Sequence, residues 1–452
     1  MTSLLHSETK SRFSAADPAI AGKHRPWSWV PTLYFAEGLP YVMVMSLSVI
    51  LFKNFGMSNG DIAFYTSWLY LPWTLKFLWS PVVDLVRTKR WWIVTMQLLV
   101  AVCLGGVALS LPGPHWLAWS LVFFWIMAFG SATHDIAADG FYMHALTEDR
   151  QQWFIGIRNT FYRLAMICGQ GLLVMLAGHL EKRTSNFLGM DPIRFAWTLT
   201  FILTAAVFLV LGLYHALQLP HPRSDQARQT ASGGLVSQLG NIGQTFGSFF
   251  RKPHIVLAIA FMLLYRFSEA QLVKLTSPFL LDTREVGGLG LDTAQVGFAY
   301  GTIGVVALVA GGILGGWVIA RRGLKRSLMP MALALCLPNL VYVWFAFAQP
   351  ANRLAIYAGI ALEQLGYGYG FTAYTAYLLH FCRGPFQTAH YAFCTAIMAL
   401  GMMVPGMFAG RLQEWFARLF ADTMGGYPAF FLWIMLCTLP CFAVVELVRR
   451  RL

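Results

Sequence analysis

The chain alternates long apolar runs with short polar turns. A transmembrane helix needs about 20 predominantly apolar residues, because the hydrocarbon core of a bilayer is ~30 Å thick. Several runs exceed this length, which indicates tilted helices. The pattern predicts an all-α membrane protein with twelve transmembrane helices, at 28–52, 61–81, 91–111, 115–140, 152–180, 194–217, 253–281, 292–320, 327–348, 353–380, 387–415 and 427–449.

The longest polar segment, residues 218–252, contains prolines, arginines and a Ser/Gly/Gln-rich middle. It predicts a cytoplasmic linker between an N-terminal half at 1–217 and a C-terminal half at 253–452, each with six helices. Short basic turns follow the second helix, at 80–90, and the eighth helix, at 315–326. Their equivalent places favour an internal repeat.

Composition agrees with a membrane protein, since 57% hydrophobic and 12% charged residues do not describe a soluble surface. The net charge of +13 could indicate nucleic-acid binding, so the position of the basic residues decides. With a cytoplasmic N-terminus, the inner segments hold 20 Lys and Arg residues and the outer segments hold eight. This excess predicts that both termini are cytoplasmic and that no nucleic acid is bound.

The seven cysteines form no CxxC or Cys/His spacing, and most lie inside apolar runs. No disulfide framework and no metal site is predicted. His134 next to Asp135 is a single pair, which is weak evidence for a metal or a proton relay. Residues 1–23 are polar and lack the apolar run of a cleavable signal peptide.

Acidic residues at membrane depth are the clearest functional signal. A charge at the centre of a membrane helix costs about 2.5–3.5 kcal/mol, so such a group must pair, face water or bind a proton. The acids fall on predicted helices 1, 4, 7 and 10, which are equivalent in a protein built of three-helix repeats, and transporters carry their sites where repeats meet. These acids are Glu37, Asp135, Asp139, Glu269 and Glu363.

Four of these acids are candidates for proton coupling: Glu37, Asp135, Glu269 and Glu363. A carboxylate in a site of alternating exposure can carry a proton across, as proton-coupled transport requires. Gly38 and Pro40 interrupt the helix directly after Glu37, where freed backbone groups can line a cavity.

Cations at the same depth suit an anionic substrate. Arg163, Arg266 and Lys274 are expected to receive ligand carboxylates. Arg266 and Glu269 are three residues apart, so they share a helix face and can also simply pair with each other. Arg158 or Arg163 is expected to neutralise Asp135. Tyr367 and Tyr369 either stack on a sugar ring or only pack.

A gate is predicted at the cytoplasmic side. Asp139 lies about one turn from Asp135 toward the cytoplasmic end of helix 4, and Asp84 lies beside two arginines with which it can form a salt-bridge latch. The predicted gating residues are Asp84, Arg87, Arg90, Asp139, Arg321 and Arg322.

Several motifs resemble the AmpG-like permeases of the major facilitator superfamily. They include FAEGLP at 35–40, KFLWSP at 76–81 with Asp84, Ser131-Ala132 followed by Asp135 and Asp139, and Glu363 with the glycines that follow it. The similarity runs from about residue 33 to 415, and KFLWSP is its most specific piece.

This resemblance implies a proton-coupled secondary transporter that imports anhydromuropeptides, anionic sugar-peptides from peptidoglycan turnover, by alternating access. It implies a bacterial inner-membrane monomer that is not an enzyme and uses the proton gradient without a cofactor. The chain departs from the family pattern with Arg266, Glu269 and His390 where Lys, Asp and Gln are usual, and it ends at Leu452 without two further helices.

Two other functions remain open from the sequence. A siderophore or other small-molecule uptake carrier fits the same fold. A membrane sensor or enzyme that uses His134 and Asp135 is a weaker alternative, because the chain has no HExxH motif and no Ser/His/Asp arrangement.

Overall fold

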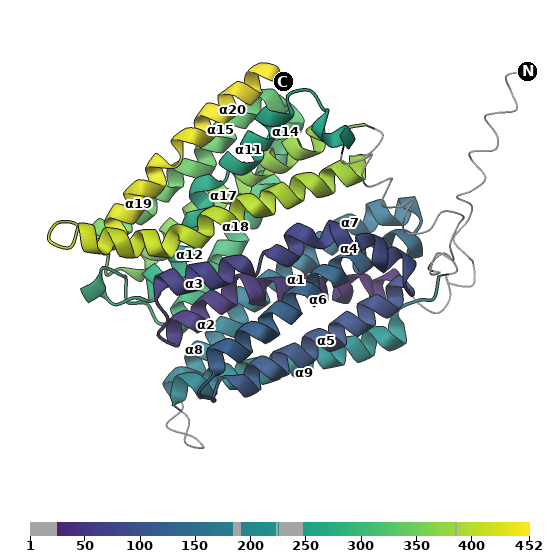
Figure 1. Cartoon of the computed structure of the whole chain (residues 1–452), viewed down its shortest axis with the longest axis horizontal. Helices are drawn as coiled ribbons and strands as arrows, with labels where there is room; N and C mark the ends of the chain where they lie inside the picture. The colour runs from purple at the N-terminus through teal and green to yellow at the C-terminus, as the bar shows by residue number, and fades with distance from the viewer. Residues whose placement is uncertain (1–24, 184–190, 223–224, 226–246, 385–386) are drawn as a thin grey trace, which may run out of the picture.

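The computed structural model describes residues 25–183, 191–222, 225, 247–384 and 387–452. Within these ranges the chain forms helices joined by short turns (Figure 1). Ten helical segments are long and apolar enough to cross a membrane. The predicted runs at 61–81 and 353–380 are not among these ten, although both are helical. The all-helical class is therefore confirmed, and the count of twelve spans stays a prediction.

The N-terminal helices follow the predicted runs, with breaks where the sequence disfavours regular helix. Pro40 lies inside the first helix, where it cannot donate a backbone hydrogen bond, and a π-helical turn follows. The elements are α1 (Val30–Val42), η3 (Met43–Leu47), α2 (Ser48–Asn54), α3 (Asn59–Trp68), α4 (Leu71–Leu85), α5 (Lys89–Ser110), α6 (Trp116–Ala145), α7 (Glu148–Met166), η4 (Ile167–Leu173), α8 (Val174–Arg183) and α9 (Pro192–Gln218).

The C-terminal helices show similar breaks. The predicted seventh helix is interrupted at Tyr265 and Arg266, which separate α11 from α12. The elements are α11 (Ile255–Leu264), α12 (Phe267–Leu281), η5 (Arg284–Val286), α13 (Thr293–Val296), η6 (Gly297–Gly304), α14 (Val305–Arg322), α15 (Leu324–Cys336), η7 (Leu337–Asn339), α16 (Leu340–Ala348), α17 (Arg353–Phe381), α18 (Gln387–Leu419), α19 (Gly426–Leu436) and α20 (Leu439–Arg451). Most of the predicted linker at 218–252 lies outside the described residues, so the division at this segment stays a prediction.

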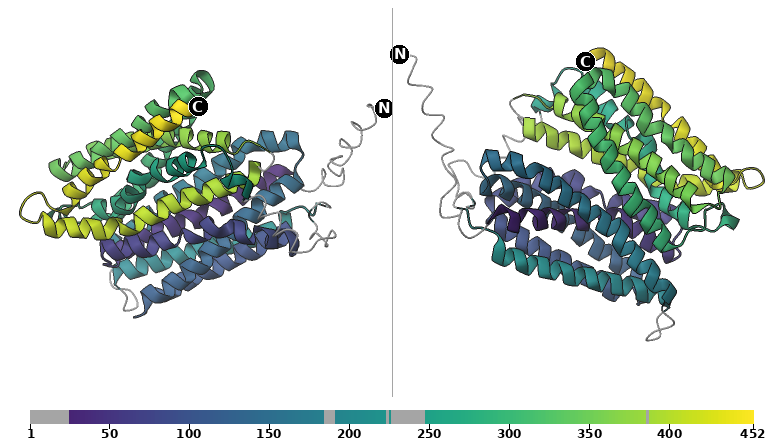
Figure 2. Two further views of the ribbon diagram at one scale, coloured as in Figure 1. Left: turned by 45° about the horizontal axis from the view of Figure 1, so that its top comes forward. Right: turned by 180° about the vertical axis from the view of Figure 1, so that it is seen from behind.

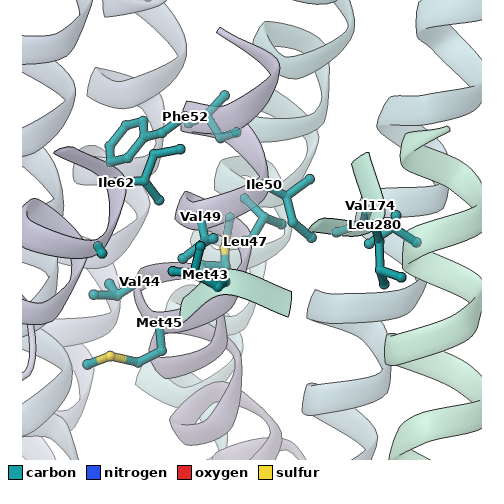
Figure 3. Packing of buried hydrophobic residues seen from close by; sticks show 14 of the residues in the cluster. Met43, Val44, Met45, Leu47, Val49, Ile50, Phe52, Ile62, Val174 and Leu280 are labelled. Atoms are coloured by element: carbon teal, nitrogen blue, oxygen red, sulfur yellow. The ribbon is translucent and has the colours of Figure 1, made fainter. Parts of the chain in front are cut away.

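The N-terminal helices, α1 to α9, and the C-terminal helices, α11 to α20, form two sets that lie side by side and converge at one end of the molecule (Figures 1 and 2). We call this the distal end; it contains the end of α2, the start of α3 and the end of α12. The opposite end, with the start of α1 and the end of α20, is the terminal end. Figure 3 shows the core near the distal end, where Leu47 and Ile50 lie among buried apolar side chains that include Val174 of α8 and Leu280 of α12.

Polar contacts between the two sets concentrate at the distal end. Lys53 Nζ lies 2.7 Å from Asp282 Oδ1, and Lys182 Nζ lies 2.6 Å from Asp292 Oδ2. Asn59 of α3 donates to the Tyr427 hydroxyl at 2.9 Å. Between the described parts of the two sets, the hydrogen bonds and ion pairs lie at this end, apart from one bond near the middle of the molecule. The distal end is therefore closed.

Candidate functional site

A cavity of about 860 Å³ lies between α7 and α14, with α1 behind it. Its two walls differ in character. The wall from α1 and α7 carries polar and charged side chains, whereas the wall from α14 is apolar. Residues of the polar wall include Tyr34, Glu37, Arg158, Asn159, Thr160, Tyr162 and Arg163, and those of the apolar wall are Val306, Leu308, Val309, Gly312 and Ile313. Of the predicted site residues, this cavity is lined by Glu37 and Arg163.

Glu37 is buried on this polar wall with unused hydrogen-bonding capacity. Its side chain is on α1, it is 7% exposed, and its Oε2 atom has no hydrogen-bond partner. The next residue, Gly38, permits close packing of α1 on α7, since a Cβ there would lie 3.0 Å from the Tyr162 carbonyl oxygen. No described Lys, Arg or His nitrogen lies within 4.0 Å of the Glu37 carboxylate. Glu37 is thus an unpaired buried acid at the cavity.

The two aspartates of α6 are each paired with a different cation. Asp135 Oδ2 lies 3.7 Å from Lys76 Nζ and accepts a hydrogen bond from Trp73 Nε1 at 3.1 Å. The expectation that Arg158 or Arg163 neutralises Asp135 is wrong, because the packing of α4 against α6 brings Lys76 to this carboxylate instead.

Arg158 forms an ion pair with Asp139. Its Nη2 atom lies 2.8 Å from Asp139 Oδ1, and its guanidinium lies 4.4 Å from the centre of the Tyr34 ring. Tyr34 also donates to Asp139 Oδ1 at 3.4 Å. Arg163 differs from Arg158, since its described contact is a bond from Nη1 to Met166 Sδ at 3.3 Å, and no described carboxylate lies within 4.0 Å. Arg163 is therefore available to an anion in the cavity.

Arg266 and Glu269 form a two-point ion pair at the break between α11 and α12. The Nε–Oε2 distance is 3.0 Å and the Nη2–Oε1 distance is 2.8 Å. Arg266 Nη2 also donates to the Tyr367 hydroxyl at 2.8 Å. Of the two possibilities that the sequence left open for Arg266 and Glu269, the structure shows the pairing, and their predicted roles in substrate binding and proton coupling stay predictions. Tyr369 is half-buried against the apolar cluster of the C-terminal helices, so it takes no part in this ion pair.

Lys274 is a buried cation of the C-terminal helices. It is 2% exposed, donates to Thr66 Oγ1 of α3 at 3.0 Å, and lies 5.1 Å from the centre of the Tyr70 ring. No carboxylate of the described residues lies within 4.0 Å of its Nζ atom. This lysine supplies the hydrogen bond that joins the two sets of helices near the middle of the molecule.

Glu363 does not line the cavity. It is 4% exposed within the C-terminal helices and accepts hydrogen bonds from the Tyr342 hydroxyl at 3.3 Å and from Gln364 Nε2 at 2.9 Å. The Tyr342 hydroxyl in turn lies 2.5 Å from the Tyr300 hydroxyl. Glu37 therefore lines the cavity and Glu363 does not, and the predicted ring of acids stays a prediction.

The predicted gating residues are spread over the terminal end. Arg90 donates to the carbonyl oxygens of Leu219, at 3.2 Å, and Ala216, so it caps the end of α9. Arg87, Arg321 and Arg322 are exposed. The side chain of Asp84 lies outside the described part of the structure, and a gating role for this set stays a prediction.

Sequence reasoning missed the distal network. Its members sit at helix ends, where charged and amide residues are ordinary, so no local pattern marked them. Besides the two ion pairs, Tyr427 donates to Asp282 Oδ2 at 2.6 Å, Asn54 donates to Thr293 at 2.8 Å, and the Gly60 amide donates to Glu414 at 2.7 Å. Only folding brings these groups together, since the partners in each contact are more than 100 residues apart.

Comparisons with known proteins agree with this fold. A family model for the Major Facilitator Superfamily matches residues 32–410. The anhydromuropeptide permease of Escherichia coli is 25% identical over 426 residues, which cover 93% of this chain and 79% of that protein. A putative transporter, AmpG 4 of Rickettsia conorii, is 24% identical over 425 residues, which cover 91% of this chain and 94% of that protein.

Solved structures show the same fold at lower identity. A mutant form of the nucleoside transporter NupG has a TM-score of 0.69 at 14% identity, covering 92% of this chain and 98% of that one. A bacterial homologue of the human lysosomal transporter Spinster has a TM-score of 0.69 at 15% identity, covering 96% of both chains. The chain therefore belongs to the major facilitator superfamily of membrane transporters. Within that superfamily it is AmpG-like, as its motifs predicted.

Proposed function

We propose that this protein imports anhydromuropeptides across the bacterial inner membrane, coupled to protons and by alternating access. Both termini would be cytoplasmic, so the cavity between α7 and α14 would open toward the cytoplasm while the distal network closes the periplasmic side. The similarity to the Escherichia coli permease supports this substrate class. The unpaired Glu37 on the cavity wall is the observation that supports proton coupling most directly.

Among the predicted proton sites, the presence or absence of a neighbouring cation favours Glu37. Asp135 and Glu269 each have a cation within 4.0 Å. Glu37 has none, and an unpaired charge in a low-dielectric interior is costly unless the group binds a proton. Glu363 also lacks a cation partner among the described residues, but it does not line the cavity. Glu37 can therefore exchange a proton with the cavity directly, whereas Glu363 cannot.

The substrate would be held by the cations that have no carboxylate partner. Arg163 lies on the cavity wall, whereas Lys274 does not line this cavity and lies buried beside the aromatic ring of Tyr70, so it would reach the substrate only in another state of the transport cycle. A muropeptide carries carboxylates together with sugar rings, and carboxylates bind most strongly to cations that are already fixed in place. Arg266 is already satisfied by Glu269, so we assign it a structural role in orienting Tyr367.

The test is uptake into proteoliposomes that contain the purified chain. The unsubstituted protein should accumulate a labelled anhydromuropeptide when a pH gradient is imposed. Glu37→Gln should lose this accumulation yet retain exchange of labelled for unlabelled substrate, because exchange needs no net proton movement. Glu446→Gln is the control, since Glu446 lies near the end of α20, pairs with Arg449 and Arg450, and belongs neither to the cavity lining nor to the distal network. It should accumulate substrate normally.

Two results would contradict the proposal at different points. If collapsing the pH gradient leaves uptake by the unsubstituted protein unchanged, the transporter is not proton-coupled. If Glu37→Gln accumulates substrate like the unsubstituted protein, the proton is carried elsewhere, and Glu363→Gln becomes the variant to compare.

A further inference from the structure

A second cavity, of about 300 Å³, lies at the terminal end of the C-terminal helices. It is formed where α11 begins, α17 ends and α20 ends, and it shares no lining residue with the transport cavity. Its lining includes three basic side chains, Lys252, Arg383 and Arg451, which we call the basic rim, and apolar side chains such as Leu257 and Phe381, which we call the floor. His254 and His380 also line it, and no aspartate or glutamate side chain does.

The basic groups at this rim lack carboxylate partners. Glu446, the acid nearest in sequence to Arg451, is taken by Arg449 and Arg450, at 2.8 Å and 3.0 Å. Neither Arg383 nor Arg451 has a carboxylate within 4.0 Å in the described part of the chain. Lys252 Nζ donates to the carbonyl oxygens of Phe381, at 2.7 Å, and Arg383, at 3.0 Å. An ammonium group has three donors, so one remains for a ligand.

The surroundings of this cavity are apolar on the outer surface of the bundle. Val256, next to Leu257, is 78% exposed, and Leu379 and Leu447 are exposed as well. Apolar side chains that face outward on a membrane protein are covered by acyl chains. The cavity therefore lies where the lipid-facing surface of the helices meets their basic ends, which is the level of phospholipid head groups.

We propose that this cavity binds the phosphate-bearing head group of an anionic phospholipid. Basic pockets between transmembrane helices are suited to such head groups, because each Lys or Arg near the membrane surface strengthens the attraction. A soluble phosphate compound would use the same cations. The lipid is favoured here because the floor of the cavity and the exposed side chains beside it are apolar, and these can contact an acyl chain but offer nothing to a soluble anion.

The test uses the full chain, purified in detergent and titrated with cardiolipin or with the zwitterionic phosphatidylethanolamine, with bound lipid counted by native mass spectrometry. The double variant Arg383→Gln with Arg451→Gln removes two rim charges that are exposed, so folding should be unaffected. At about fivefold in affinity per cation, this variant should bind cardiolipin ~25-fold more weakly. The matched control is Arg449→Gln with Arg450→Gln, which removes two charges from the same helix end outside the cavity.

Cardiolipin binding that weakens in the rim variant and not in the control would support the proposal. Equal losses in both variants would overturn it, because the attraction would then come from the basic helix end as a whole. Equal affinity for cardiolipin and phosphatidylethanolamine would also overturn it. A last arm adds inorganic phosphate. If phosphate binds in a rim-dependent manner while cardiolipin does not, the cavity is a site for soluble anions and the lipid assignment is wrong.

Discussion

The ion pairs at the distal end lead to a prediction about the ratio of molecules with a closed and an open distal end. Asp282→Asn removes the charge that attracts Lys53 but keeps the shape of the side chain and its ability to accept hydrogen bonds. Lys53 belongs to α2 and Asp282 follows α12, so this ion pair joins the two sets of helices directly. If alternating access requires the distal end to open, the substitution should favour the open state.

The free energy contributed by this ion pair can be estimated from its distance and its exposure to solvent. A separation of 2.7 Å corresponds to about 6 kcal/mol of Coulomb attraction at an effective dielectric constant of ~20. Most of this is offset by lost hydration, and fully exposed pairs contribute only ~0.2–1 kcal/mol. The two side chains are 15% and 18% exposed, so we expect about 1–2 kcal/mol. The ratio of closed to open molecules should then fall about 5- to 30-fold.

Spin-label distance measurements can read this ratio. Labels at Arg183→Cys and Glu285→Cys, two exposed positions on opposite sides of the distal contact, should report one short distance in the parent protein. Asp282→Asn should add a longer distance. Asp191→Asn is the matched control, since its ion pair with Arg194 lies within one set of helices and an asparagine can still cap α9. If the Asp282 variant gives the same distances as the parent and the control, the distal ion pair does not hold the closed state.

Three further predictions concern the cavity and the helix contacts around it. Arg158→Gln should lower the melting temperature, because Asp139 loses its ion pair at a cost of ~0.5–2 kcal/mol. Arg163→Gln should leave the melting temperature unchanged and raise the KM for an anionic substrate about tenfold, which corresponds to ~1.4 kcal/mol. Equal melting temperatures of the two variants would show that the Arg158 ion pair does not contribute to stability. Gly301→Ala should prevent the close approach of η4 and η6, since the added Cβ would overlap the backbone at Gly171, and uptake should fall at least about tenfold. Gly105→Ala is the control: its Cβ would meet nothing within 4 Å, so this variant should transport normally. Asp135→Asn should abolish uptake by leaving Lys76 without its carboxylate, and normal transport by this variant would remove Asp135 from the mechanism.

The sequence by itself determined the fold class and the chemistry that the interior must contain. Apolar runs of membrane-spanning length predict helices because backbone groups in hydrocarbon must be satisfied within the segment. Charges such as Glu37 and Lys274 stand out for the same reason, since their cost inside a bilayer requires an explanation. The possibility that Arg266 pairs with Glu269 was also readable, because the two residues are three positions apart at the start of α12 and local geometry decides the contact.

Tertiary structure alone decided the partners that come from different helices. Asp135 pairs with Lys76 and Asp139 with Arg158, because the rotation and depth of packed helices select the neighbours, and periodicity carries no information on either. The same holds for the distal pair of Lys53 and Asp282, which are more than 200 residues apart. These contacts leave Glu37 as the unpaired acid on the cavity wall. Which carboxylates stay without a cation is a property of the packing: among the described residues Glu37 and Glu363 do, and of these two only Glu37 lines the cavity.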